Sequence, residues 1–193
     1  MKHTIHRIAI FASGNGSNTK NIIEYFALSN NISVVLIVCN KPGAGVLQIA
    51  RENNINSLLI EKEEFFRGDS YIIDLKKAGV DFIVLAGFLW KIPLTLIKEY
   101  SGKIINIHPA LLPKFGGKGM YGNHVHEAVI AAGEKKSGIT IHYVDELYDH
   151  GRHIFQAVCP VLPADTSESL AKKIHLLEYE YYPKVIEDVL LNI

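Results

Sequence analysis

The chain has 193 residues, a length that suits one large domain and allows a sizeable core without disulfides or metals. Hydrophobic residues make up 48% and charged residues 21%, and 20 basic side chains balance 20 acidic ones. This composition excludes a disordered chain. It also argues against a nucleic-acid coat or a membrane-surface protein, because both need a basic excess.

The two cysteines and the N-terminal region indicate a cytoplasmic protein. Cys39 and Cys159 each end an apolar, β-branched run, so we expect two buried thiols and no disulfide framework. The apolar run at 8–12 is too short for a signal peptide, and no stretch approaches the ~18 apolar residues of a membrane span. We therefore expect no membrane and no nucleic-acid partner.

The first 110 residues alternate β-rich and helical segments in chain order. The segments with strand-like patterns are 7–11, 32–39, 57–60, 81–86 and 104–108. The segments with helical spacing are 17–28, 46–53, 69–78 and 93–100. Such alternation implies right-handed crossovers. It therefore predicts an α/β fold of three layers, with a mostly parallel, twisted sheet covered by helices on both faces.

The second part of the chain has a different order. A glycine-rich stretch over 109–123 precedes a predicted helix at 124–132 and two predicted strands at 138–144 and 153–158. A long amphipathic helix is predicted over 167–191, with Thr166 or Ser167 as its cap and a kink or break at Pro183. Without a linker, we expect a single domain, 1–193, with a phosphate-binding half at 1–110 and a catalytic-loop half at 111–193.

Polar residues follow several of the predicted parallel strands, where α/β proteins bind their ligands. These segments are 12–18, 39–44, 87–92 and 106–116. The first contains Ser13-Gly14-Asn15-Gly16-Ser17-Asn18 between a strand and a helix, a setting that suits a phosphate. It is not a Walker loop, and Thr19 stands where a dinucleotide fingerprint has its third glycine. A purely structural turn is the alternative.

Asn106 and His108 end a predicted strand and lie on the same side of it, because side chains alternate along a strand. An amide can hydrogen-bond a developing oxyanion, and an imidazole can move a proton near neutral pH. Asp149 lies in the acidic turn 145–151, where it either orients a histidine or is merely solvated. The spacing of the histidines at 124, 126, 150 and 153 matches no usual zinc pattern, so we expect no metal.

The segment Phe88-Leu89-Trp90-Lys91-Ile92 follows another predicted strand. It forms either a packed apolar rim or a wall for a flat heteroaromatic ligand.

Several segments occur in an order that resembles the folate-dependent formyltransferases, in particular their glycinamide ribonucleotide (GAR) formyltransferase branch. They are IAIFASGNGSN at 8–18, VLAGF at 84–88, INIHPALLPKF at 105–115, GITIHYVDELYDHG at 138–151 and EYEYYP at 178–183. The resemblance implies a Rossmann-like formyltransferase fold. It also implies transfer of a formyl group from 10-formyltetrahydrofolate to the amine of GAR in de novo purine synthesis, without a metal.

The resemblance also implies roles for individual residues. Asn106, His108 and Asp149 match the catalytic residues. The residues that match GAR contacts are Gly16, Ser17, Asn18, Thr19, His175 and Glu178. The residues that match folate contacts are Arg67, Leu89, Trp90, Lys91, Ile92, Val144, Asp145 and Tyr148. His142 matches a histidine near the active centre, and the glycine-rich loop 116–123 is expected to be a mobile lid.

Three other functions remain as alternatives. Methionyl-tRNA formyltransferases and formyltetrahydrofolate hydrolases share the Asn/His/Asp core, but each is expected to carry an additional domain. A non-catalytic nucleotide-binding module would use only the 13–18 loop. The expected partners of the chain are small-molecule substrates, and the expected assembly is a monomer or a homodimer.

Overall fold

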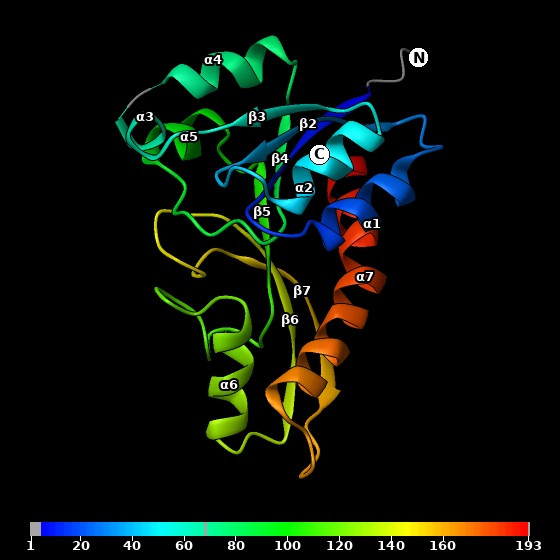
Figure 1. The fold of residues 1–193 in the computed structure, drawn as a ribbon, viewed down its shortest axis with the longest axis vertical. Coiled ribbons are helices and arrows are strands. Elements are labelled where there is room, and N and C mark those ends of the chain that lie inside the picture. The colour runs from blue at the N-terminus through cyan, green and yellow to red at the C-terminus, as the bar shows by residue number, and fades with distance from the viewer. Residues whose placement is uncertain (1–4, 68, 193) are drawn as a thin grey trace.

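The computed structural model describes residues 5–67 and 69–192 (Figure 1). In these residues one sheet has the strand order β3-β2-β1-β4-β5-β6-β7. The strands are β1 (His6–Ala12), β2 (Ile32–Cys39), β3 (Asn56–Leu59), β4 (Phe82–Leu85), β5 (Ile104–His108), β6 (Lys136–Tyr143) and β7 (His153–Pro160). The neighbouring strands β3, β2, β1, β4 and β5 are parallel to one another, whereas β6 is antiparallel to β5 and β7 is antiparallel to β6.

Helices cover both faces of the sheet (Figure 1). They are α1 (Ser17–Phe26), α2 (Gly45–Glu52), α3 (Lys62–Arg67), α4 (Ser70–Lys77), α5 (Leu94–Glu99), α6 (Asn123–Ala131) and α7 (Ser167–Leu191). Side chains alternate along β1, so Ile8 and Ile10 pack with α1, α2 and α7, while Ala9 and Phe11 pack with α3, α4 and α5. The expected three-layer α/β fold is therefore confirmed.

The expected elements are present, with local differences. Helix α3 was not predicted, because its six residues, KEEFFR, are too few to show a helical period. Strand β3 begins one residue earlier than expected, at Asn56. Thr166 is the N-cap of α7: its hydroxyl accepts from the Ser169 amide, and the Ser169 hydroxyl accepts from the Thr166 amide.

Pro183 does not break α7, which runs continuously from Ser167 to Leu191. Proline has no N–H, so the carbonyl of Tyr179, four residues earlier, loses its usual helical donor. The side chain of Asn21 on α1 donates to that carbonyl at 2.9 Å. The expected break was wrong because a second helix supplies the missing hydrogen bond.

The antiparallel part of the sheet depends on glycines that allow close backbone contacts. A side chain at Gly138 would collide with the Ala157 carbonyl of β7, and one at Gly151 would collide with the Tyr143 carbonyl of β6. Gly151 closes the turn that carries Asp149. The position of that turn therefore depends on a residue that has no side chain.

Two further findings concern the described residues alone. No helix in 5–67 and 69–192 is long and apolar enough to cross a membrane. Both cysteines in that part of the chain are buried free thiols, as the sequence predicted.

Candidate active site

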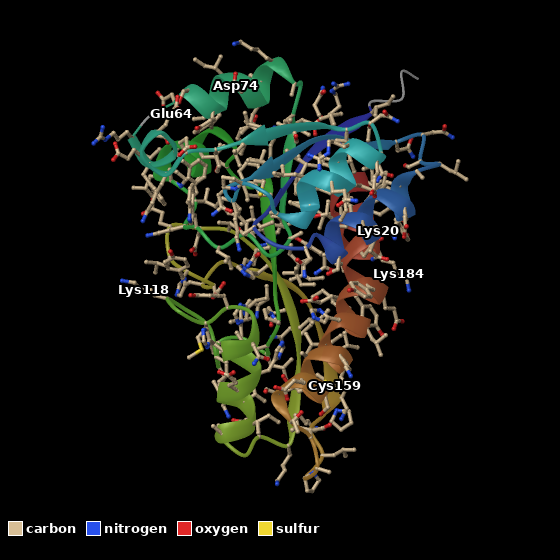
Figure 2. The ribbon with its side chains drawn as sticks, in the orientation of Figure 1. Lys20, Glu64, Asp74, Lys118, Cys159 and Lys184 are labelled. Atoms are coloured by element: carbon tan, nitrogen blue, oxygen red, sulfur yellow. The ribbon has the colours of Figure 1, made fainter. Side chains whose placement is uncertain are left out.

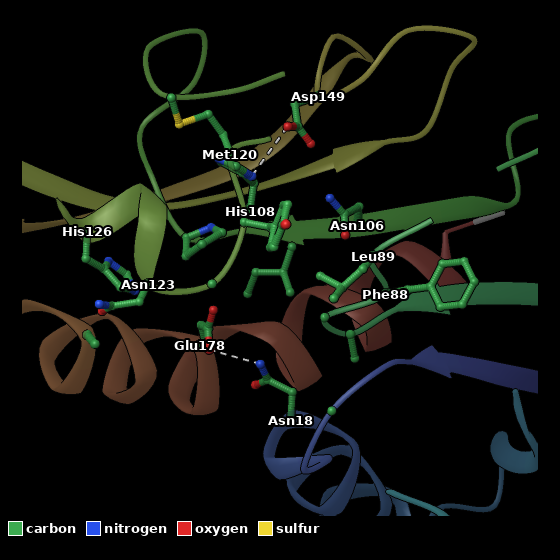
Figure 3. A pocket seen from close by; sticks show the side chains of 18 of the residues that line it. Asn18, Phe88, Leu89, Asn106, His108, Met120, Asn123, His126, Asp149 and Glu178 are labelled. Carbon is green, nitrogen blue, oxygen red and sulfur yellow. Dashed lines mark hydrogen bonds and ion pairs between the residues drawn. The ribbon is translucent and has the colours of Figure 1, made fainter. Parts of the chain in front are cut away.

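A cavity of about 740 Å³ lies at the carboxyl ends of β1, β4 and β5 (Figure 3). The loop before α6, the helices α6 and α7, and the turn after β6 also line it. Its lining residues are Gly14–Asn18, Ala86–Leu89, Asn106–Pro109, Gly117–Asn123, His126, Tyr148, Asp149, Ala171, His175 and Glu178. Three of the four expected segments contribute to it, and 39–44 does not.

The loop 13–18 forms one end of this cavity at the start of α1. Gly16 has a positive φ of 80°, and a side chain there would come within 2.9 Å of the Val46 backbone. Only glycine therefore fits. The Ser13 amide donates to the Gly87 carbonyl at 3.1 Å, and the Ser13 hydroxyl accepts from the Leu89 amide at 2.9 Å. These bonds hold the 13–18 loop against the 86–89 loop.

Glu178 faces the 13–18 loop from α7 and is buried. One of its oxygens accepts from the Asn18 amide at 2.9 Å (Figure 3), and the same oxygen accepts from His175 Nδ1 at 2.9 Å. The bond to Glu178 raises the pKa of the half-exposed His175 above its ordinary 6.5. The bond to Glu178 therefore favours the charged form of the imidazole at the end of the cavity where helix α1 begins.

Two buried polar atoms near the start of α1 have no protein partner. They are the Thr19 hydroxyl and the Asn18 side-chain oxygen. Thr19 is fully buried and does not line the cavity, so its contact with GAR stays a prediction.

At the other end of the cavity, Asp149 lies between two buried histidines. Its carboxylate is 3.6 Å from His108 Nδ1 and 3.7 Å from His142 Nε2. The Asn106 amide is 3.1 Å from that same His142 nitrogen. The structure therefore brings Asn106, His108 and Asp149 together on one wall (Figure 3), and His142, which does not line the cavity, lies close to Asn106 and Asp149.

His142 is a neutral hydrogen-bond acceptor toward Asn106. Burial lowers its pKa, and its Nδ1–H donates to the Tyr143 carbonyl at 2.8 Å. The unprotonated Nε2 then accepts one N–H of the Asn106 amide. The orientation of the amide is thereby fixed, and its second N–H remains for a ligand.

His108 and Asp149 are held by the backbone of the loop that follows β5. His108 Nε2 donates to the Phe115 carbonyl at 2.8 Å, so both ring nitrogens face acceptors. The Gly117 amide donates to Asp149 at 2.9 Å. A side chain on Gly116 would lie 3.2 Å from the Asp149 Cβ and 2.5 Å from Leu112, so glycine is needed there.

The apolar side of the cavity is formed by Phe88, Leu89 and Tyr148. Trp90 lies beside it in a cluster with Phe65, Phe66 and Phe88, at ring separations of 5.9–6.3 Å. The beginning of the 88–92 segment thus lines the cavity and Trp90 packs beside it, while a flat heteroaromatic ligand at this wall stays a prediction.

The remaining predicted folate contacts lie outside the lining. Arg67 is exposed and pairs with Glu63 at 3.4 Å. Ile92 is in the core, and Val144 packs against it. Asp145 accepts from the Leu147 amide within its own turn, and Lys91 lies 5.8 Å from the Tyr148 ring. Their folate contacts stay predictions.

Several lining residues were not predicted. The segment 117–123 lines one wall of the cavity. Within it, the side chain of Lys118 is exposed and points outward (Figure 2). His126 lines the cavity from α6, and the sequence signals it only as a histidine near the glycine-rich stretch. In the part of the chain that the structure describes, no group of three or more His, Cys, Asp or Glu side chains could hold a metal.

The chain matches a known protein family. Residues 6–186 match the family described as Formyl transferase. The chain therefore belongs to the formyl transferase family.

The chain is also similar to proteins named phosphoribosylglycinamide formyltransferase. It is 44% identical to the chloroplastic protein of Arabidopsis thaliana, over 93% of this chain and 64% of that one. It is 40% identical to the Bacillus subtilis protein, over 95% and 94%. A crystal structure from Geobacillus kaustophilus, named glycinamide ribonucleotide transformylase 1, has a TM-score of 0.87 at 37% identity, over 96% and 99%.

These similarities bear on two expectations. They confirm the resemblance to the GAR formyltransferase branch. The chain spans only 64% of the length of the Arabidopsis relative, which is named chloroplastic, so the cytoplasmic location stays a prediction.

Proposed function

We propose that the protein transfers a formyl group from 10-formyltetrahydrofolate to the amine of GAR, in de novo purine synthesis. The observation that carries the proposal is the arrangement of one cavity. Asn106, His108 and Asp149 lie at one end, and the 13–18 loop with Glu178 and His175 lies at the other.

The end with the 13–18 loop suits the phosphate and ribose of GAR. A glycine-rich turn at a helix N-terminus offers backbone N–H groups to an anion, and His175 adds a positive charge. The Glu178 carboxylate can accept hydrogen bonds from ribose hydroxyls. The proposed contacts of Gly16, Ser17 and Asn18 follow from this placement, with Thr19 in support.

The apolar side suits the flat ring system of the folate. Phe88, Leu89 and Tyr148 offer an apolar and aromatic surface next to Asn106. The cavity volume of about 740 Å³ is in the range of small-molecule sites. Both substrates can therefore meet beside Asn106.

Two groups stabilise the negative charge that develops during the reaction: the free N–H of Asn106 and a protonated His108. The neutral amine of GAR attacks the formyl carbon, a C–N bond forms, and negative charge builds on the formyl oxygen. Asn106 faces this charge through its free N–H, and His108 faces it through Nδ1–H, which lies 3.6 Å from Asp149 and is therefore not hydrogen-bonded to it. The bond between the formyl carbon and N10 then breaks, a proton from His108 reaches N10, and the amine loses its own proton.

Asp149, 3.6 Å from His108 Nδ1, stabilises the positive charge of the proton donor and orders a water that accepts the proton of the amine. The products are the formamide of GAR and tetrahydrofolate. Alignment of the two substrates adds to the rate, since well-oriented pairs gain roughly 7–11 kcal/mol.

The test is a formyl-transfer assay with GAR and 10-formyltetrahydrofolate, run in parallel with formyl-Met-tRNA formation and with hydrolysis of the folate. Formylation of GAR is the expected result. Activity in either parallel assay alone, or in none of them, contradicts the proposal.

Replacing Asp149 tests the mechanism. We expect Asp149→Asn to lower kcat by on the order of 10²-fold or more while substrate binding survives, because the charge beside His108 is lost. Glu146→Gln is the matched control, since Glu146 is exposed in the same turn. Near-normal turnover of the Asp149 variant would remove this residue from the mechanism.

A further inference from the structure

His126 is a buried polar residue for which the mechanism above gives no role. It lies in the first turns of α6, is 3% exposed and lines the cavity (Figure 3). Its Nδ1 is buried and has no hydrogen-bond partner among residues 5–67 and 69–192. Buried polar groups almost always have partners. Nε2, the other ring nitrogen, is not among the fully buried unpartnered atoms, so it is the nitrogen that a molecule in the cavity can reach.

The imidazole of His126 is neutral. Burial lowers its pKa, and the positive charges of His175 and His108 act in the same direction, against an opposing effect of Glu178. A neutral imidazole has one N–H donor and one acceptor nitrogen. An orphaned acceptor is tolerated more often than an orphaned N–H, so we expect Nδ1 to be the acceptor and Nε2 to carry the proton.

The surroundings of His126 place it between the two ends of the cavity. On α7, Glu178 and His175 belong to the end assigned to phosphate and ribose. On β5, His108 belongs to the end assigned to formyl transfer. A substrate that spans both ends has its uncharged sugar between them, and a neutral donor suits an uncharged oxygen better than a phosphate.

We propose that His126 is a further substrate-binding residue, whose Nε2–H donates to an oxygen of the sugar that links the phosphate to the reacting amine. The inference rests on the proposed function, because that function supplies the sugar. This role gives a function to a polar side chain that is buried on α6.

Three substitutions test this role. His126→Leu removes the donor, His126→Gln retains an amide N–H at about the reach of Nε2, and His126→Asn retains one only at the reach of Nδ1. We expect His126→Leu and His126→Asn to raise KM for GAR roughly tenfold, as for a lost hydrogen bond. His126→Gln should stay within about threefold, and KM for the folate should not change in any variant.

The matched control is His124→Leu. His124 lies on the same helix, its side chain is 65% exposed, and it pairs with Glu127. We expect wild-type values of KM for this variant. Unchanged KM for GAR in His126→Leu would overturn the inference. So would a loss that is equal for the Gln and Asn variants, because a packing role does not distinguish their donors.

Substrate analogues identify the partner of His126. A GAR analogue that lacks the ribose hydroxyl in contact with the imidazole should bind the wild type more weakly than GAR does. His126→Leu should bind that analogue and GAR equally well, because the contact is already lost. If the loss of affinity from His126→Leu and the loss from the analogue add up for both the 2′-deoxy and the 3′-deoxy compound, a contact with these hydroxyls is overturned.

Binding of ribose 5-phosphate, measured by calorimetry, separates this inference from the proposed function. If the wild type does not formylate GAR, the proposed function fails. Weaker binding of ribose 5-phosphate by His126→Leu than by His124→Leu would still support the sugar contact. Equal binding by these two variants would overturn it.

Discussion

Individual residues of the site are positioned by neighbours, and two of these, His142 and Phe115, lie outside the catalytic group. His142 orients the Asn106 amide, and the Phe115 carbonyl and Asp149 orient His108. Each of these contacts comes from a different stretch of chain. The chemistry at Asn106 and His108 therefore depends on residues that a list of catalytic groups omits.

Replacing His142 tests this dependence. We expect His142→Leu to lower kcat by about tenfold, less than the 10²–10³-fold typical for loss of an oxyanion donor, because Asn106 remains but is no longer fixed. KM for GAR should change little. Steady-state kinetics give both constants, and a change confined to KM would contradict a positioning role.

His175 predicts a pH dependence of GAR binding. Its pKa is raised above 6.5 by Glu178, so its positive charge is complete below that value and is lost as pH rises through the raised pKa. KM for GAR should therefore increase as pH rises through this range. The contribution of the His175–Glu178 pair to folding stability should decrease over the same range.

A lysine at position 175 provides the control, because its charge persists to higher pH. His175→Lys should flatten the pH profile of KM, and His175→Gln should give a high KM at every pH. The titration of the GAR phosphate is common to all three proteins. Parallel profiles for the wild type and the lysine variant would contradict the role of His175.

At this scale the sequence predicts a site residue where a local rule applies. Asn106 and His108 follow from strand alternation, and the 13–18 loop follows from its glycines. Asp149 needs the fold, because its turn meets β5 only through the pairing of β5 with β6. His126 shows no local signal, since its orphaned nitrogen exists only once α6 packs beside α7.

Among the elements, α7 contributes most to the site beyond the parallel strands. It supplies Glu178 and His175, and it contacts α1 through Asn21 and Asn18. Its length and capping are readable from the sequence. Its continuity through Pro183 is not, because the replacement hydrogen bond comes from a helix more than 150 residues away.

Asn21 and Pro183 form a testable pair. We expect Asn21→Ala to lower the free energy of unfolding by about 0.5–1.5 kcal/mol, because the exposed hydrogen bond to the Tyr179 carbonyl is lost. In a Pro183→Ala background the helix supplies its own N–H, so the same Asn21 substitution should cost much less. Urea denaturation of the four proteins measures both effects, and strictly additive changes would refute the coupling.

For the molecule as a whole, the cavity joins the parallel and the antiparallel parts of the sheet. One end is built on β1 and α1, and the other on β5, β6 and the loop before α6. The fold class follows from the strand–helix alternation. The meeting of the two ends does not, because it depends on long-range contacts that no local pattern encodes.

A ligand that bridges these parts should stabilise the entire fold. We expect GAR at a hundred times its Kd to raise the free energy of unfolding by about 2.7 kcal/mol, since it binds only the folded chain. Thermal unfolding monitored by circular dichroism measures this as an increase in Tm. Glycinamide, which lacks the sugar and the phosphate, is the control, and an equal increase with both would contradict the proposed binding.

Gly151 helps to recognise which homologous sequences can form a working active site. Any side chain at this position collides with the Tyr143 carbonyl, so the turn that presents Asp149 would have to shift. A homologous chain can thus retain the aspartate and still present it wrongly. We expect the pattern of an aspartate followed two positions later by glycine to identify working members more reliably than the aspartate alone.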